Sequence, residues 1–178
     1  VHYSFLVQAY VWGEAEAPTT LPANLAIPIC AIGDHLGLPP LLPYSGYVLD
    51  NWYRLDKSGG ISLDNIAMHQ NFLGGQDENW FVLVHVAIEA EAGRALQLAT
   101  ELVEAAAQHD ADKVEQLLTD MNRVWDAMNA HFDRMPERCD PYIYYQRVRP
   151  YIHGWKNNPA LPEGLIYEGV IKYAGRPQ

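Results

Sequence analysis

Cysteine is scarce in this chain, because only two of its 178 residues are of that type. Two cysteines cannot make a disulfide framework. Cys30 and Cys139 lie in apolar or proline-bounded segments, so we expect buried thiols in a reducing compartment. No stretch reaches the roughly 18 consecutive apolar residues of a membrane span, and Val1-His2-Tyr3 lacks the charged start of a signal peptide. These absences favour a cytoplasmic protein with no membrane partner. The missing Met predicts a piece of a longer protein.

Basic residues are also few. Twelve Lys and Arg face twenty-two Asp and Glu, for a formal charge of −10. Nucleic-acid binding needs a cationic face that displaces counterions, so nucleic acid is excluded as a partner. The spacings of a zinc site, a nucleophile elbow, a phosphate loop and a dinucleotide-binding turn are all missing. We therefore expect no metal site built from the side chains of this chain.

What the sequence does have is helical periodicity, and no convincing strand alternation accompanies it. The predicted fold is all-α, with long antiparallel helices in one domain over residues 1–178. Asp77 or Asn79 is expected to cap the longest helix, and Asp110 or Asp112 the next. The helices are predicted at 1–12, 25–36, 62–72, about 77–107, 114–135 and 142–152. Residues 41–55 are predicted as a loop with a short helix or turn, and 154–178 as an extended loop.

One histidine stands out because it lies within the strongest helical pattern. His85 follows Phe81 by four residues and precedes Glu89 by four, so the three share a face. Glu89 could hold one ring nitrogen and fix the tautomer. Taken alone, His85 is either an interhelical histidine with a satisfied hydrogen bond or a group that overhangs a ligand pocket.

Aromatic and basic residues are concentrated in Tyr142–Arg149, which has three tyrosines and two arginines in eight residues. On a helix Tyr145, Arg149 and His153 would form one stripe. A guanidinium beside aromatic rings suits a flat ligand that bears a carboxylate, and the alternative is an ordinary aromatic helix packed on the core with surface arginines. Tyr44 and Tyr47 could likewise line an aromatic pocket or pack a connection.

Several blocks, in order along nearly the whole chain, resemble the indoleamine 2,3-dioxygenase family. The most specific are YVWG at Tyr10–Gly13 and GWKNNPALPEGLIYEG at Gly154–Gly169. The others are LPANLAIP at Leu21–Pro28, LPP at Leu38–Pro40, VLDNW at Val48–Trp52, the helix Phe81–Glu89, and RPYIH at Arg149–His153. The resemblance implies an all-helical protein that binds haem b and uses O₂ to cleave the indole C2–C3 bond of L-tryptophan, giving N-formylkynurenine.

The resemblance also implies roles for individual residues. Arg149 corresponds to the arginine that binds the substrate carboxylate, Phe81 to the aromatic that packs against the indole, and His85 to the distal position over the indole nitrogen, which is serine in vertebrate members. The other implied pocket positions are Tyr44 and Tyr144 beside the substrate and Tyr47, Tyr145 and His153 beside the haem.

Two features of the family are expected beyond Gln178, namely the proximal histidine that binds iron and a Gly- and Ser-rich loop over the substrate. We therefore expect this piece to be inactive alone, with the remaining segment of the same protein as its partner. Two alternatives stay open. One is a haem-binding relative that oxidises an indole differently, and the other is a non-catalytic helical binding domain.

Overall fold

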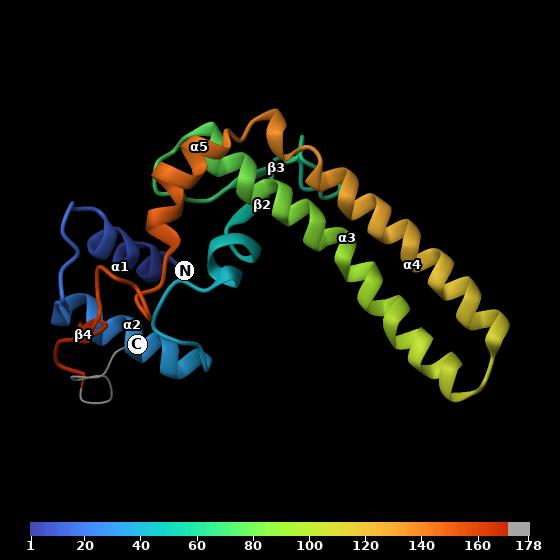
Figure 1. Cartoon of the computed structure of the whole chain (residues 1–178), viewed down its shortest axis with the longest axis horizontal. Helices are drawn as coiled ribbons and strands as arrows, with labels where there is room; N and C mark the ends of the chain where they lie inside the picture. The colour runs from blue at the N-terminus through green and yellow to red at the C-terminus, as the bar shows by residue number, and fades with distance from the viewer. Residues whose placement is uncertain (171–178) are drawn as a thin grey trace. The chain divides into compact units, whose positions relative to one another are not determined.

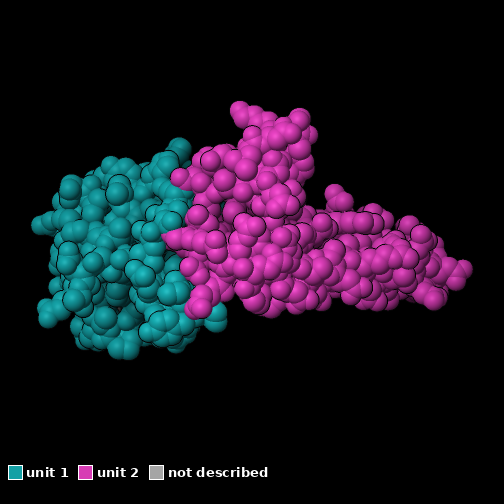
Figure 2. All heavy atoms as spheres, turned by 90° about the horizontal axis from the view of Figure 1, so that it is seen from above, with its two compact units in different colours: residues 1–51, 70–74, 141–178 teal, residues 52–69, 75–140 magenta. Residues whose placement is uncertain are grey.

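The computed structural model describes residues 1–170, which form two compact units. Unit 1 combines residues 1–51 and 70–74 with residues from 141 onward, and unit 2 combines residues 52–69 and 75–140. The two are coloured teal and magenta in Figure 2. The chain is mostly helical, so the all-α prediction is confirmed. Among the described residues, no helix is both long enough and apolar enough to span a membrane.

Unit 1 is built on two helices that match the predicted ones. α1 (His2–Trp12) and α2 (Ala23–Leu36) are joined through the short strand β1 (Thr20–Leu21). Pro28 lies inside α2, within its second turn, and Gly37 ends the helix in a left-handed conformation with φ 67°. A glycine adopts this conformation without steric cost, which explains the sharp stop there.

The segment after residue 154 contradicts the prediction of an extended loop. Its strand β4 (Ile166–Tyr167) pairs in parallel with β1, about 145 residues earlier in the chain. Trp155, Leu161, Leu165 and Tyr167 are almost fully buried in the same cluster as the apolar side chains of α1 and α2. The Tyr167 hydroxyl donates to the carbonyl of Pro40 at 2.9 Å. The described part of this segment is therefore core, while residues 171–178 lie outside the described residues.

Unit 2 contains the long antiparallel hairpin of α3 (Gln76–Ala107) and α4 (Ala111–Phe132), seen at the green and gold end of Figure 1. Leu98, Ala105, Leu117 and Val124 form its core. Asp110 caps α4 by accepting from the Lys113 amide at 3.0 Å, which confirms one of the two predicted caps. The predicted cap of α3 is wrong, because the helix begins after Gly75 without a side-chain cap. Asp77 instead accepts from the Asp140 amide at 2.7 Å.

The predicted helix at 62–72 is also wrong. A turn leads into β3 (Ile66–Met68), which pairs antiparallel with β2 (Trp52–Arg54). Asn65 stabilises the connection by donating to the carbonyls of Asp56 and Gly60 and accepting from the Asp56 amide. These local side-chain bonds satisfy backbone groups that a helix would otherwise pair.

The aromatic-rich segments form short irregular helices rather than regular ones. Residues 41–55 contain the π-helical turn η1 (Ser45–Leu49), in agreement with the predicted short helix or turn, but they also contain β2, and the sequence did not predict a strand there. The predicted helix 142–152 is divided into α5 (Pro141–Ile143), the π-helical turn η3 (Tyr144–Val148) and the 3₁₀ turn η4 (Arg149–Ile152). A further 3₁₀ turn, η2 (Met135–Glu137), follows α4. π-Helical turns are rare and occur frequently at functional sites.

Candidate functional site

Phe81 and His85 lie one turn apart on α3 in unit 2, and their rings touch. The ring centroids are 4.3 Å apart, with the planes tilted by 39°. Nδ1 of His85 lies 2.7 Å from the carbonyl oxygen of Phe81. A carbonyl only accepts, so Nδ1 carries the proton, and in the neutral imidazole Nε2 then carries the lone pair. The main chain of α3 thus fixes the tautomer and presents an acceptor at Nε2.

The segment with the candidate arginine lies in unit 1. The Arg149 guanidinium stands 4.8 Å from the centre of the Tyr145 ring, so the predicted neighbourhood of these two residues is confirmed. Within residues 1–170 Arg149 makes no ion pair with a carboxylate, although acidic residues outnumber basic ones in the sequence. Tyr144, also on η3, is partly buried. A guanidinium stacked on a ring keeps its donors available for a planar anion.

His153 does not continue the predicted stripe of Tyr145 and Arg149. η4 ends at Ile152, and His153 has extended backbone with ψ 135°. Its side chain is exposed. Its carbonyl accepts from the Trp12 indole N–H at 2.9 Å, which attaches the end of η4 to α1.

Tyr44 and Tyr47 differ in their surroundings. Tyr44 is 47% exposed, whereas Tyr47 is 4% exposed and packs against Phe5 and Phe72 at centroid distances of 6.0 and 6.2 Å. The fully buried Asn51 follows η1 and donates to the carbonyl of Tyr47 at 3.1 Å. These contacts make Tyr47 part of a packed aromatic group.

Sequence reasoning overlooked Asn51 and Phe72. Asn51 also donates to the Gln70 carbonyl at 2.8 Å and accepts from the Gln70 amide at 3.2 Å. It thereby attaches the segment 70–74 to η1. An asparagine that follows an apolar run was the available signal, since buried amides are kept where they satisfy backbone groups.

The candidate residues therefore fall into two groups. Phe81 and His85 belong to unit 2, and they contact each other along α3. The remaining candidates belong to unit 1, where η1, η3 and η4 carry them: Tyr44, Tyr47, Tyr144, Tyr145, Arg149 and His153.

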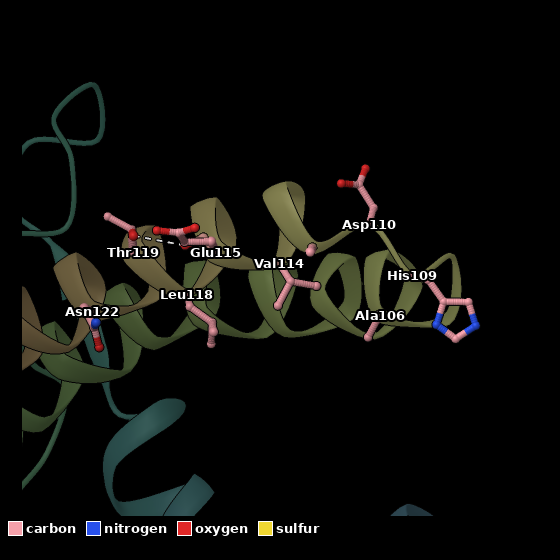
Figure 3. Close-up of a pocket in the computed structure, with 9 residues that line it drawn as sticks. Ala106, His109, Asp110, Val114, Glu115, Leu118, Thr119 and Asn122 are labelled. Atoms are coloured by element: carbon pink, nitrogen blue, oxygen red, sulfur yellow. Dashed lines mark hydrogen bonds between the residues drawn. The ribbon is translucent and has the colours of Figure 1, made fainter.

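A pocket of about 510 Å³ lies elsewhere, at the connected end of the α3–α4 hairpin. In Figure 3 the side chains of Ala106 and Leu118 lie on one side of the hairpin, while the carboxylates of Asp110 and Glu115 point to the other. The pocket is shallow, contains none of the candidate residues, and its polar groups do not converge. We therefore do not regard it as the site. Within the described residues, no cluster of three or more His, Cys, Asp or Glu could hold a metal ion.

Residues 2–178 match the family model described as indoleamine 2,3-dioxygenase. The chain belongs to the indoleamine 2,3-dioxygenase family. It is 36% identical to indoleamine 2,3-dioxygenase 2 of Homo sapiens over 97% of this chain and 44% of that protein. It is 36% identical to indoleamine 2,3-dioxygenase 1 of Rattus norvegicus, over 93% of this chain and 41% of that protein. An indoleamine 2,3-dioxygenase of Saccharomyces cerevisiae is 31% identical over 95% of this chain and 39% of its own length. The chain thus spans less than half the length of these relatives in the indoleamine 2,3-dioxygenase family.

Proposed function

We propose that the protein containing this chain is a haem-dependent dioxygenase that opens the indole ring of L-tryptophan. Both atoms of O₂ would be added across the C2–C3 bond, which breaks to give N-formylkynurenine. The proposal is supported by family membership and by relatives named indoleamine 2,3-dioxygenase. We place the reaction in the cytoplasm, in keeping with two cysteines that are buried and form no disulfide.

Haem b is the proposed cofactor, and it would supply the binding and activation of O₂. The described residues have side chains that suit the side of the haem on which the substrate binds. Tyr44 and Tyr145 expose 47% and 57% of their surface, which offers flat aromatic area, and the His85 imidazole has an acceptor at Nε2 in the tautomer whose proton is on Nδ1. An axial ligand to the iron remains expected in the part of the protein beyond Gln178.

The observation that carries the proposal is the 2.7 Å contact between Nδ1 of His85 and the Phe81 carbonyl oxygen. With Nδ1–H held by the Phe81 carbonyl, Nε2 of the neutral ring can only accept a hydrogen bond. The polar hydrogen of an indole ring is its N–H, a donor that matches this acceptor. The Phe81 ring, 4.3 Å from the imidazole, would supply apolar surface for the indole. We propose that this pair orients the indole, while His85 need not act as a strong base.

The amino-acid end of the substrate is assigned to η3 and η4. Arg149 would bind the carboxylate through two parallel N–H donors, with Tyr145 beneath the guanidinium and Tyr144 beside it. Tyr47 and His153 are proposed as further residues beside the haem. Because Tyr47 is packed and His153 is exposed, we expect smaller effects from their replacement than from that of Arg149.

The test is the product formed by the full-length protein, loaded with haem and supplied with L-tryptophan and O₂. A product heavier than tryptophan by two oxygen atoms, with both atoms derived from ¹⁸O₂, supports the proposal. Gain of a single oxygen atom would indicate the first alternative, a relative that oxidises an indole differently. Haem absorption that does not respond to L-tryptophan, together with no product, would indicate a non-catalytic helical domain.

A further inference from the structure

Residues 70–74 form an isolated piece of unit 1, because the residues on both sides of them in the chain belong to unit 2. Both main-chain groups of Gln70 bond to the buried Asn51, and the Gln70 side-chain oxygen lies 2.7 Å from Nδ1 of His2. This short piece is therefore attached firmly to η1 and α1 through polar contacts.

The same piece places one aromatic ring among three others. Phe72 stacks on Phe5 of α1 with the centroids 4.6 Å apart and the planes 23° apart. It stacks on Tyr151 of η4 at 5.1 Å and 14°, and lies 6.2 Å from Tyr47 of η1 at 26°. We name these four residues the aromatic cluster, and Phe72 is the member in contact with all the others.

Two of the elements that meet in the aromatic cluster carry proposed substrate residues. Tyr151 lies two residues after Arg149 on η4, and Tyr47 lies three residues after Tyr44 at η1. η4 is a single 3₁₀ turn next to a π-helical turn, so its own backbone hydrogen bonds constrain it weakly. Its orientation therefore depends on contacts such as the Phe72–Tyr151 stack and the bond from Trp12 to the His153 carbonyl.

We propose that Phe72 is a positioning residue for substrate binding, acting through Tyr151 on Arg149. This inference rests on the proposed function. A displacement of about 1 Å in a binding group is enough to lower catalytic efficiency by up to about a hundredfold. Phe72 itself need not touch the substrate.

The test uses the full-length protein with Phe72→Leu, which keeps an apolar side chain but removes the ring. An aromatic pair corresponds to a factor of about two to ten in an equilibrium constant, and the stack on Tyr151 is one of three. We expect KM for L-tryptophan to rise about tenfold, with kcat changed less than threefold. Phe72→Tyr retains the stack and should restore KM to within about twofold. The matched control is Tyr53→Leu, which removes an exposed aromatic ring of β2 that pairs with His69 at 5.0 Å, outside the aromatic cluster, and should leave KM unchanged.

Two further measurements separate positioning from general packing. In the double variant Phe72→Leu with Arg149→Ala, KM should equal that of Arg149→Ala alone, because a positioning effect requires the arginine. Amide hydrogen exchange should become faster in residues 144–152 of Phe72→Leu and remain slow in α4. Additive effects on KM, or unchanged exchange in 144–152, would overturn the inference. The exchange measurement needs no turnover. If the protein fails to oxidise tryptophan, the proposed function is refuted, and the exchange of residues 144–152 still tests whether Phe72 positions η4.

Discussion

Replacing His85 by Phe gives a direct test of the acceptor at Nε2. The substitution keeps an aromatic ring against Phe81, now 4.3 Å from the imidazole, and removes both ring nitrogens. In the variant the indole N–H of a bound substrate would lose its partner in a site shielded from water. An unpaired buried donor costs about 1–3 kcal/mol, which corresponds to a factor of roughly 5 to 150 in Kd.

The assay compares two ligands in the full-length protein: L-tryptophan, and L-tryptophan methylated on the indole nitrogen, which has no hydrogen to donate. Calorimetric Kd values for L-tryptophan should rise by at least about fivefold in His85→Phe, while those for the methylated ligand should change by less than about twofold. His131→Phe, a change on α4 of a histidine 3.9 Å from Glu91, is the matched control. Equal losses for the two ligands would show that His85 contributes packing rather than an acceptor, and the reasoning would fail.

Three other outcomes follow from single contacts. Arg149→Ala should raise KM for L-tryptophan at least about tenfold, because the loss of a charged hydrogen bond costs several kcal/mol. Arg149→Lys should raise KM nearly as much, because a lysine cannot bind a carboxylate through two parallel donors. An unchanged KM would contradict the assignment of Arg149. Tyr167→Phe removes the buried bond to Pro40 and should lower the free energy of unfolding by about 1–2 kcal/mol in urea titrations, without changing ligand affinity. For Cys139, burial and then the carboxylates of Asp77 and Asp140 raise the pKa to about 11 from 9.0. The folded thiol should therefore resist alkylation at pH 8, and rapid alkylation of the native protein would contradict this. The contribution of the protonated thiol to the free energy of unfolding should be complete below pH 9 and should be lost as the pH rises from 9 to 11.

The helices of the hairpin were predictable because their signals are local. Apolar residues recur at helical spacing through Val114 to Phe132, and Asp110 stands where a cap is needed. The pairing of Tyr145 with Arg149 was predictable for the same reason, because it needs only a separation of four residues. In each case the information lies within one or two turns of the chain.

The rest depended on contacts between distant residues. The Gly-, Pro- and Asn-rich segment after residue 154 has no periodicity, yet Trp155 and Tyr167 are buried because β4 pairs with β1 across the chain. The π-helical turns η1 and η3 depart from the spacing of a regular helix, so a periodicity of 3.6 could not reveal them. Phe72 looked like the end of a helix, and only its three ring partners indicate a role.

The surface of the α3–α4 hairpin determines which sample these experiments need. Five large apolar side chains are between 47% and 72% exposed, and they repeat at seven-residue intervals on each helix: Leu96 and Val103 on α3, and Leu118, Trp125 and Phe132 on α4. A seam with this spacing is typical of a helix face that packs against other helices. The chain spans less than half the length of its relatives. Stability or affinity measured on this piece alone would therefore reflect both the substitution and the exposed apolar side chains of the seam. Stability and affinity are therefore best compared between variants of the full-length protein, where a change at His85 or Phe72 is the only difference.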